Sequence, residues 1–171
     1  MLADVRHGRI ADGMCAAIER VSLSGEELSK AVTGLVSRAN IREAVVLSTC
    51  NRTEVVAVAE RFHGAYADIR DFFCELGGMQ PDELHPHLYS QHDDAAVSHL
   101  FEVAAGLDSA VLGESEILGQ VRGAWELAQA EGGTKATLNL LFRHALETGK
   151  RARTETSIGK HTASVSHAAV E

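Results

Sequence analysis

Two short apolar runs on either side of a polar connection constrain the fold of this chain more than any other feature. Residues 43–47 form a largely apolar run that contains two valines, and residues 55–58 form another that is mostly valine. The connection between them, Ser-Thr-Cys-Asn-Arg-Thr, has the length of a hairpin turn. We therefore predict two antiparallel strands whose turn carries Cys50.

The elements around this hairpin predict an α+β fold. Ser24 followed by Glu27 has the form of a capping box at a helix start, and apolar residues then recur at helical spacing. Residues 62–76 are a second predicted helix, which ends at a pair of glycines. A short helical turn opens at Pro81, and residues 87–92 have the form of a strand.

The order of these elements predicts a small sheet followed by a helical part. With one more strand ahead of the first helix it would read βαββαβ, the ferredoxin-like pattern. Residues 1–20 show neither strand alternation nor a helical stripe, which leaves that first strand in doubt. After residue 92 only helical patterns follow, and Asp93 or Asp94 is expected to cap the first of these helices. The later helices are expected over 117–130, over 134–153 and from 162 onward.

We expect these elements to form one domain over residues 1–160. Its α+β part covers about 1–92, and its helical part covers about 93–160. Hydrophobic residues make up 45% and charged residues 23% of the 171 residues, which is an ordinary globular composition. No apolar run approaches the roughly 18 residues that span a bilayer, and the N-terminus lacks the form of a signal peptide. We therefore expect a cytoplasmic protein with no membrane partner.

Charge limits the surfaces that can bind nucleic acid. The net charge of −8 argues against sequence-independent binding over the whole surface. A local basic face is possible between Arg143 and Lys160, where Lys150, Arg151 and Arg153 also fall. The alternative is a solvated helix face.

Of the three cysteines, only Cys50 has polar neighbours suited to chemistry. The spacing of the three fits neither a disulfide framework nor a Cys-x-x-Cys metal site. Cys15 and Cys74 are expected to be small buried hydrophobic residues. The histidines other than His99, including His85 and His87, lack a metal-ligand spacing, so no metal site is expected.

The turn around Cys50 suggests a nucleophile beside a group that binds carboxylates. A free thiol with a pKa of about 8.5 is roughly 3% thiolate at pH 7, and a nearby cation raises that fraction. Arg52 can act in this way, or it can point away and hold an acidic substrate. Thr49 and Asn51 can donate hydrogen bonds to the same substrate. The alternative is a polar turn with no chemical role.

Two features of the helical part are candidates for the same site. His99 can serve as an acid, a base or a carbonyl polariser for a nucleophilic cysteine, or it can be an ordinary helix histidine. Residues 106–120 join two helices, and three glycines punctuate them. Carboxylates in this stretch can bind the ammonium of an amino acid, and the alternative is two ordinary helix caps. The candidate site residues that we single out in this stretch are Ser109, Glu114, Ser115, Glu116 and Gln120.

Nucleotide-binding motifs are absent from the sequence. None of the 15 glycines forms a Gly-x-Gly pair. The chain therefore has neither a dinucleotide-binding fingerprint nor a P-loop.

Several motifs taken together resemble the N-terminal catalytic domain of glutamyl-tRNA reductase. They are Val46-Leu-Ser-Thr-Cys-Asn-Arg-Thr-Glu54, His99-Leu-Phe, Gly106-Leu-Asp-Ser109, Leu112-Gly-Glu-Ser-Glu-Ile-Leu-Gly-Gln-Val121 and Lys150-Arg-Ala-Arg-Thr-Glu-Thr-Ser-Ile-Gly159. The resemblance covers about residues 22–171, and because the motifs occur in order it is more specific than any one of them. The family's opening strand and its Gly-x-x-His-[Arg/Lys]-[Thr/Ser]-Ala-Pro pattern have no match in residues 1–17.

The resemblance implies a reaction and the residues that carry it. Cys50 would attack the ester carbonyl of glutamyl-tRNA and form a thioester. NADPH would then reduce the thioester to glutamate-1-semialdehyde, the precursor of 5-aminolevulinate and of tetrapyrroles such as porphyrins. His99 matches the family's activity-supporting histidine. The residues that match its glutamate-recognition segments are Thr49, Asn51, Arg52, Ser109, Glu114, Ser115, Glu116 and Gln120.

The resemblance also implies partners beyond this chain. NADPH would be bound by a downstream domain that is absent here, and a homodimer would form through a missing C-terminal domain. The product would be passed to glutamate-1-semialdehyde aminomutase. Residues 161–171 look like the start of the long spinal helix that links these domains. On this interpretation the chain carries only the thioester-forming domain.

Two other functions are open from the residues. The first is a free-standing thiol esterase or acyltransferase that acts on aminoacyl esters. The second is a non-catalytic module that binds tRNA or a partner protein. A covalent glutamyl adduct that is lost in Cys50→Ala would separate catalysis from binding.

Overall fold

A four-stranded sheet lies at the centre of the computed structural model, which describes residues 1–6, 14–109, 112–114 and 116–158. The strand order is β2-β3-β1-β4, and every pair of neighbours is antiparallel. The strands are β1 (Leu2–Arg6), β2 (Glu43–Ser48), β3 (Arg52–Val58) and β4 (Leu88–Gln91). The chain therefore has a mixed α/β fold with a small antiparallel sheet.

The predicted hairpin is confirmed. Strands β2 and β3 pair up to Ser48 opposite Thr53, which leaves residues 49–51 in the turn. Two hydroxyl groups bind the base of this turn to residues 21–23 of the preceding chain. Ser48 Oγ accepts a hydrogen bond from the backbone N–H of Leu23 at 3.0 Å, and Thr53 Oγ1 donates one to the carbonyl of Val21 at 3.1 Å.

The first strand, which the sequence left in doubt, is present as β1 inside the sheet. Val5 lies opposite Thr53 of β3 on one side and opposite Leu88 of β4 on the other. The sequence of this strand, Leu-Ala-Asp-Val-Arg, is too short and too mixed for a local pattern to identify. Pairing on both sides supplies the hydrogen bonds that hold it in the sheet.

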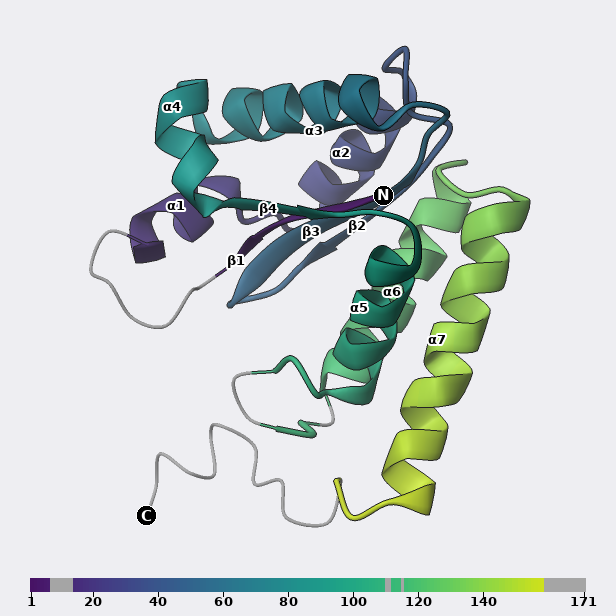
Figure 1. Cartoon of the computed structure of the whole chain (residues 1–171). Coiled ribbons are helices and arrows are strands. Elements are labelled where there is room, and N and C mark those ends of the chain that lie inside the picture. The colour runs from purple at the N-terminus through teal and green to yellow at the C-terminus, as the bar shows by residue number, and fades with distance from the viewer. Residues whose placement is uncertain (7–13, 110–111, 115, 159–171) are drawn as a thin grey trace.

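Helices cover both faces of the sheet (Figure 1). On one face lie α1 (Met14–Val21), α2 (Glu26–Val36), α3 (Phe62–Gly77) and α4 (Pro81–Leu84), which a short 3₁₀ turn (His85–His87) joins to β4. On the other face lie α5 (Asp93–Ala105), α6 (Glu116–Ala130) and α7 (Ala136–Glu155). Because the sheet is covered on both sides, residues 43–47 of β2 are buried without alternation.

Helix α1 was not predicted, because residues 1–20 show no helical stripe. The other helices agree with the predicted ranges, but two of their caps do not. Helix α2 is capped by Gly25 and not by Ser24, although the Glu27 carboxylate still accepts the Ser24 N–H at 3.2 Å. Helix α5 is capped by His92, so the expected aspartate cap is wrong and Asp93 is the first helical residue. An acidic residue in the first turn is nevertheless favourable next to the positive end of the helix dipole.

Helix α7 takes its N-terminal cap from the sheet. The buried Glu43 of β2 accepts hydrogen bonds from the N–H groups of Lys135 and Leu138 at 2.7 and 2.9 Å. This carboxylate therefore ties the helical part to the sheet. The helix expected from residue 162 lies outside the described residues. Within the described part of the chain, the helices are too short or too polar to cross a membrane.

Candidate active site

The tip of the β2–β3 hairpin presents Cys50 to solvent. The turn is held by the Thr49 N–H, which donates to the Arg52 carbonyl at 2.8 Å, and by the Asn51 N–H, which donates to Thr49 Oγ1 at 3.2 Å. These bonds use Thr49 and the backbone of Asn51 to shape the turn. The thiol itself is accessible to a reagent or a substrate.

Cys74 contrasts with Cys50. It is half-buried near the end of α3, and burial, followed by the nearby charge of Asp71, raises the pKa of its thiol. The prediction of a buried cysteine is thus confirmed in part at this position. The side chain of Cys15 lies outside the described residues.

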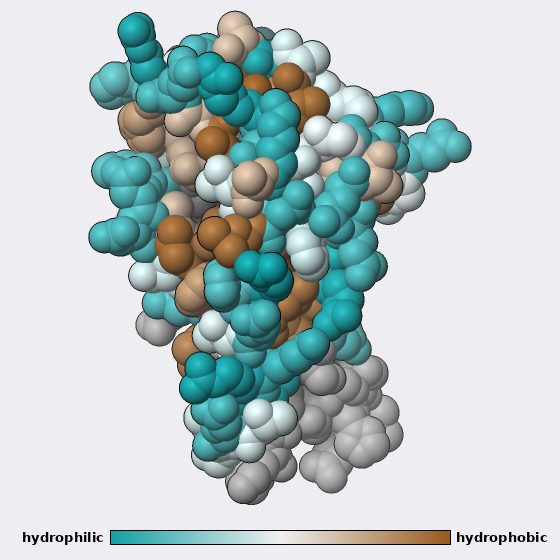
Figure 2. All heavy atoms as spheres, turned by 90° about the vertical axis from the view of Figure 1, so that its right-hand side faces the viewer, coloured by the Kyte–Doolittle hydropathy of each residue, from teal (hydrophilic) through white to brown (hydrophobic). Residues whose placement is uncertain are grey.

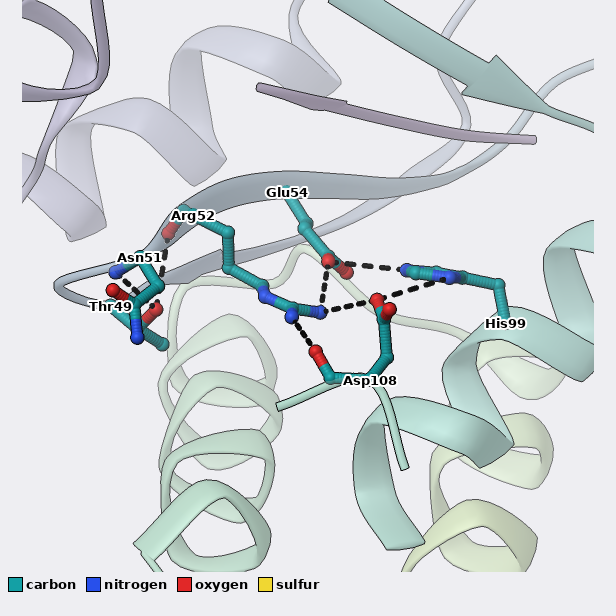
Figure 3. A network of polar contacts seen from close by, with 6 residues as sticks. All are labelled: Thr49, Asn51, Arg52, Glu54, His99 and Asp108. Atoms are coloured by element: carbon teal, nitrogen blue, oxygen red, sulfur yellow. Dashed lines mark hydrogen bonds and ion pairs between the residues drawn. The ribbon is translucent and has the colours of Figure 1, made fainter. Parts of the chain in front are cut away.

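The guanidinium of Arg52 turns away from the hairpin tip and toward the helical part (Figure 3). Its Nη1 donates to Glu54 Oε1 and to Asp108 Oδ2, each at 3.0 Å. Its Nη2 donates to the carbonyl oxygen of Asp108. Arg52 is therefore a buried, multiply bonded arginine.

His99 joins the same cluster from α5. Its Nε2 lies 3.1 Å from Glu54 Oε1, and its Nδ1 lies 3.8 Å from Asp108 Oδ2. Each ring nitrogen therefore faces a carboxylate oxygen (Figure 3).

The four side chains form a compact charge network. Their exposed fractions are 8% for Arg52, 0% for Glu54, 4% for His99 and 32% for Asp108. The Arg52 guanidinium lies between the carboxylates of Glu54 and Asp108, and charges that are buried require such pairing. One carboxylate oxygen, Glu54 Oε2, is buried without a hydrogen-bond partner among the described residues.

The network also resembles a cation site. Ligand atoms of Glu54, His99 and Asp108 lie within 4.8 Å of one another. Arg52 Nη1, however, lies 3.0 Å from both carboxylates, so the guanidinium already supplies the positive charge that these carboxylates would offer to a metal.

The structure brings some of the predicted site residues together. Arg52 and His99 meet in the network, and Ser109 follows Asp108 directly in the loop after α5. Glu116 and Gln120 are exposed on α6, and Glu114 is half-buried just before it. Ser115 lies outside the described residues.

Two members of the network, Glu54 and Asp108, were missed as site residues. Glu54 stands two positions after Arg52 in a strand, so the two side chains share a face of the sheet. A charged pair at that spacing next to an apolar run is a usable signal. Asp108 gives no such signal, because a loop position has no period that predicts its neighbours.

The predicted basic face is only partly a surface feature. Arg153 turns inward, where its Nη1 donates to the Ala104 carbonyl at 2.8 Å and its Nη2 donates to the Glu114 carbonyl at 2.9 Å. Arg151 is exposed but pairs with Glu155 at 2.9 Å. Figure 2, which views the molecule from the α7 side of Figure 1, shows hydrophilic side chains interleaved with hydrophobic ones.

The structure is thus a mixed α/β domain that carries an exposed cysteine at a hairpin tip and a buried arginine–histidine network in the same part of the fold. The sequence profile described as "Glutamyl-tRNAGlu reductase, N-terminal domain" matches residues 11–156. The chain therefore belongs to the glutamyl-tRNA reductase family and corresponds to its N-terminal domain. The resemblance seen in the motifs is thus confirmed.

Individual relatives support this assignment. A glutamyl-tRNA reductase from Frankia alni is 49% identical over 148 residues, which cover 86% of this chain and 32% of the relative. One from Paenibacillus macerans is 44% identical over 153 residues, which cover 90% of this chain and 35% of the relative. The structure of glutamyl-tRNA reductase from Methanopyrus kandleri matches with a TM-score of 0.75 and 33% identity, over 99% of this chain and 38% of that one. The chain thus spans about a third of the length of these relatives.

Proposed function

We propose that this chain is the thioester-forming domain of a glutamyl-tRNA reductase, which opens the route to 5-aminolevulinate and the tetrapyrroles. The observation that carries the proposal is the exposed Cys50, two residues before a buried arginine, in a chain of this family. Cysteine is intrinsically the most nucleophilic of the side chains that form covalent intermediates.

The step assigned to this domain is an acyl transfer without oxidation or reduction. The Cys50 sulfur forms a bond to the ester carbonyl carbon of glutamyl-tRNA, and the bond from that carbon to the ribose oxygen breaks. The thiol proton is transferred to the ribose oxygen of the released tRNA. His99, whose ring nitrogens face carboxylate oxygens of Glu54 and Asp108, is the proposed polarising or proton-donating group.

Substrate recognition is proposed to rest on the free carboxylate of the glutamyl group. Because the α-carboxyl is esterified to tRNA, the side-chain carboxyl is the only carboxyl group of the glutamyl residue that ionises. The guanidinium of Arg52 suits such a carboxylate. The polar residues proposed to hold the rest of the glutamyl group are Thr49, Asn51, Ser109, Glu114, Ser115, Glu116 and Gln120.

The reductive step is proposed for a longer protein. NADPH, when bound, would supply the hydride that reduces the thioester to glutamate-1-semialdehyde. The residues of this chain do not fit a dinucleotide, because its glycines form no Gly-x-Gly pair. We therefore assign the NADPH site, the homodimer contacts and the transfer to glutamate-1-semialdehyde aminomutase to parts of the protein outside this chain.

The domain description is a proposal of the same kind. We propose that residues 1–160 form the catalytic domain and that residues 161–171 begin a spinal helix. The strand order β2-β3-β1-β4 with antiparallel neighbours supports the proposal that the sheet follows the ferredoxin-like pattern.

Incubation with glutamyl-tRNA labelled in the glutamyl group tests the function. We expect a protein-bound label that hydroxylamine releases and that is absent in Cys50→Ala. Cys74→Ala is the matched control, and it should keep the label. Labelling that persists in Cys50→Ala, or binding without any label, would contradict the proposal. The second outcome would favour the non-catalytic tRNA-binding module.

The same assay separates the reductase domain from a free-standing thiol esterase. An esterase releases free glutamate repeatedly, and its adduct does not accumulate. A thioester-forming domain accumulates about one label per chain, because the adduct waits for a hydride. The partition of label between protein and solution therefore decides between them.

A further inference from the structure

Asp108 differs from the other partners of Arg52 in its access to solvent. Arg52, Glu54 and His99 are each less than a tenth exposed, whereas the side chain of Asp108 is 32% exposed. Figure 3 shows Asp108 approaching the guanidinium from the loop after α5, on the side opposite Glu54. A carboxylate that arrives from solvent would therefore meet Asp108 first.

The bond between Asp108 and Arg52 does not use the geometry that a carboxylate prefers. Arg52 Nη1 contacts one side-chain oxygen of Asp108, and Nη2 contacts its main-chain carbonyl. A free carboxylate can instead accept two parallel hydrogen bonds from the two terminal nitrogens. Exchange of Asp108 for such a ligand would improve the geometry.

The exchange also preserves the charge of the network. One carboxylate would leave and another would arrive, so Arg52 would stay paired with a negative group. This matters because removing a partner without replacement leaves a buried charge uncompensated. An uncharged ligand, such as the amide of a glutaminyl group, could not make this exchange.

The loop that carries Asp108 begins and ends at a glycine. It lies between Gly106 and Gly113, which have φ of 79° and 77°, and the Gly113 N–H donates to the Gly106 carbonyl at 2.8 Å. Glycine adopts this left-handed conformation without steric cost. The two glycines therefore close the base of the loop from which Asp108 reaches Arg52.

We propose that Asp108 holds Arg52 in the place of the substrate's side-chain carboxylate, and that it is displaced when a glutamyl group binds. The proposal rests on the proposed function, since it takes Arg52 as the carboxylate-binding group. Asp108 thereby sets the affinity for glutamyl substrates and contributes to their selection over glutaminyl ones.

Binding of glutamate α-methyl ester, measured by calorimetry in a Cys50→Ala background, tests this displacement. Asp108→Asn keeps the shape of the side chain and removes its charge. The dissociation constant of the ester should fall about fivefold, the factor expected when a competing, partly exposed ion pair is lost. Glutamine α-methyl ester, which lacks the side-chain carboxylate, should show no such gain.

Controls separate this effect from a general loss of charge or of structure. Asp82→Asn removes the same charge from the exposed α4 and should leave the dissociation constant unchanged. If Asp108→Asn fails to fold, a second measurement uses the chain that carries only Cys50→Ala. It follows the ¹³C resonance of the Asp108 carboxyl. That resonance should shift when the glutamate ester is added and should not shift with the glutamine ester.

Three results would overturn the proposal. They are an unchanged or higher dissociation constant in Asp108→Asn, an equal gain for the glutamine ester, and no saturable binding in either chain. Failure of the proposed function is seen separately, as absence of the Cys50 adduct in the unaltered chain. An adduct that forms while Asp108→Asn weakens ester binding would leave the function intact and reject only the displacement.

Discussion

Glu54 is the residue on which the charge network depends. It is fully buried, and its Oε1 serves both Arg52 and His99. In Glu54→Gln these two side chains keep a hydrogen-bond acceptor, but Arg52 loses a buried negative partner. We expect the free energy of unfolding to fall by about 3 kcal/mol, the cost typical of removing one partner from a buried ion pair.

Urea unfolding measures this loss, and the chain offers a matched control. Glu60 pairs with Arg42 on the surface, where both side chains are more than half exposed. Glu60→Gln should change the unfolding free energy very little, because exposed ion pairs contribute little. Equal losses in the two variants would show that the network does not behave as a buried cluster.

Cys50 and Cys74 should differ in reactivity. Burial raises the pKa of the Cys74 thiol, so at a given pH a smaller fraction of Cys74 than of an ordinary thiol is thiolate. The reaction rate of Cys74 should therefore keep rising to a higher pH than the rate of an ordinary thiol. In a Cys15→Ser background at pH 7.5, iodoacetamide should modify Cys50 at least about tenfold faster than Cys74. Peptide mass spectrometry gives both rates, and comparable rates would contradict the assignment of Cys50 as the accessible nucleophile.

At the scale of elements, the end of α7 holds the loop that carries Asp108. Arg153 donates to the carbonyls of Ala104 and Glu114, which flank that loop. Ile158, just beyond α7, lies against Gly113, where a Cβ atom would stand 2.2 Å from the Ile158 carbonyl oxygen. The geometry of the site therefore depends on where α7 ends.

Arg153→Met tests this dependence. The variant keeps the length of the side chain but leaves the Ala104 and Glu114 carbonyls without their donor, which should lower the unfolding free energy by about 2 kcal/mol. The Gly113 amide should exchange with deuterium faster, and Cys50 acylation should slow. Arg151→Met, on the exposed side of α7, is the control. Equal effects of the two variants would mean that the loop is held by other contacts.

Local patterns predicted the elements that depend on local physics. The β2–β3 hairpin and the long helices follow from apolar periodicity, and Cys50 was placed correctly at the turn. Pairings between distant segments could not be found in this way. Glu43 caps α7 across 92 residues of sequence, and Arg52 meets Asp108 across 56. Such contacts depend on how the two parts dock, and no spacing in the sequence encodes that docking.

The prediction for Arg52 shows how docking also changes the interpretation of a motif. The sequence offered two roles, lowering the pKa of the thiol or binding a carboxylate. The side chain points away from the turn and into a network with Glu54 and Asp108 (Figure 3). The second role is therefore the one that its environment favours, provided that a substrate can replace one of those carboxylates.

At the scale of the whole molecule, an acidic chain is proposed to bind an acidic substrate. The net charge of −8 opposes tRNA at long range, so binding requires a local positive surface. With Arg153 turned inward and Arg151 paired with Glu155, the exposed cations left from the predicted basic face within the described residues are Arg143 and Lys150. They stand seven positions apart on α7 and so share one side of that helix.

The salt dependence of glutamyl-tRNA binding tests whether this side of α7 contacts the phosphate backbone. The double variant Arg143→Gln, Lys150→Gln should bind glutamyl-tRNA more weakly at low salt. The slope of log affinity against log salt should also shrink, by about one for each phosphate that the variant no longer neutralises. Lys30→Gln, on α2 at the other face of the sheet, removes an exposed cation elsewhere and should leave the slope unchanged. If the double variant keeps the full slope, the tRNA backbone approaches the Cys50 hairpin from another direction, and α7 serves the site only through Arg153.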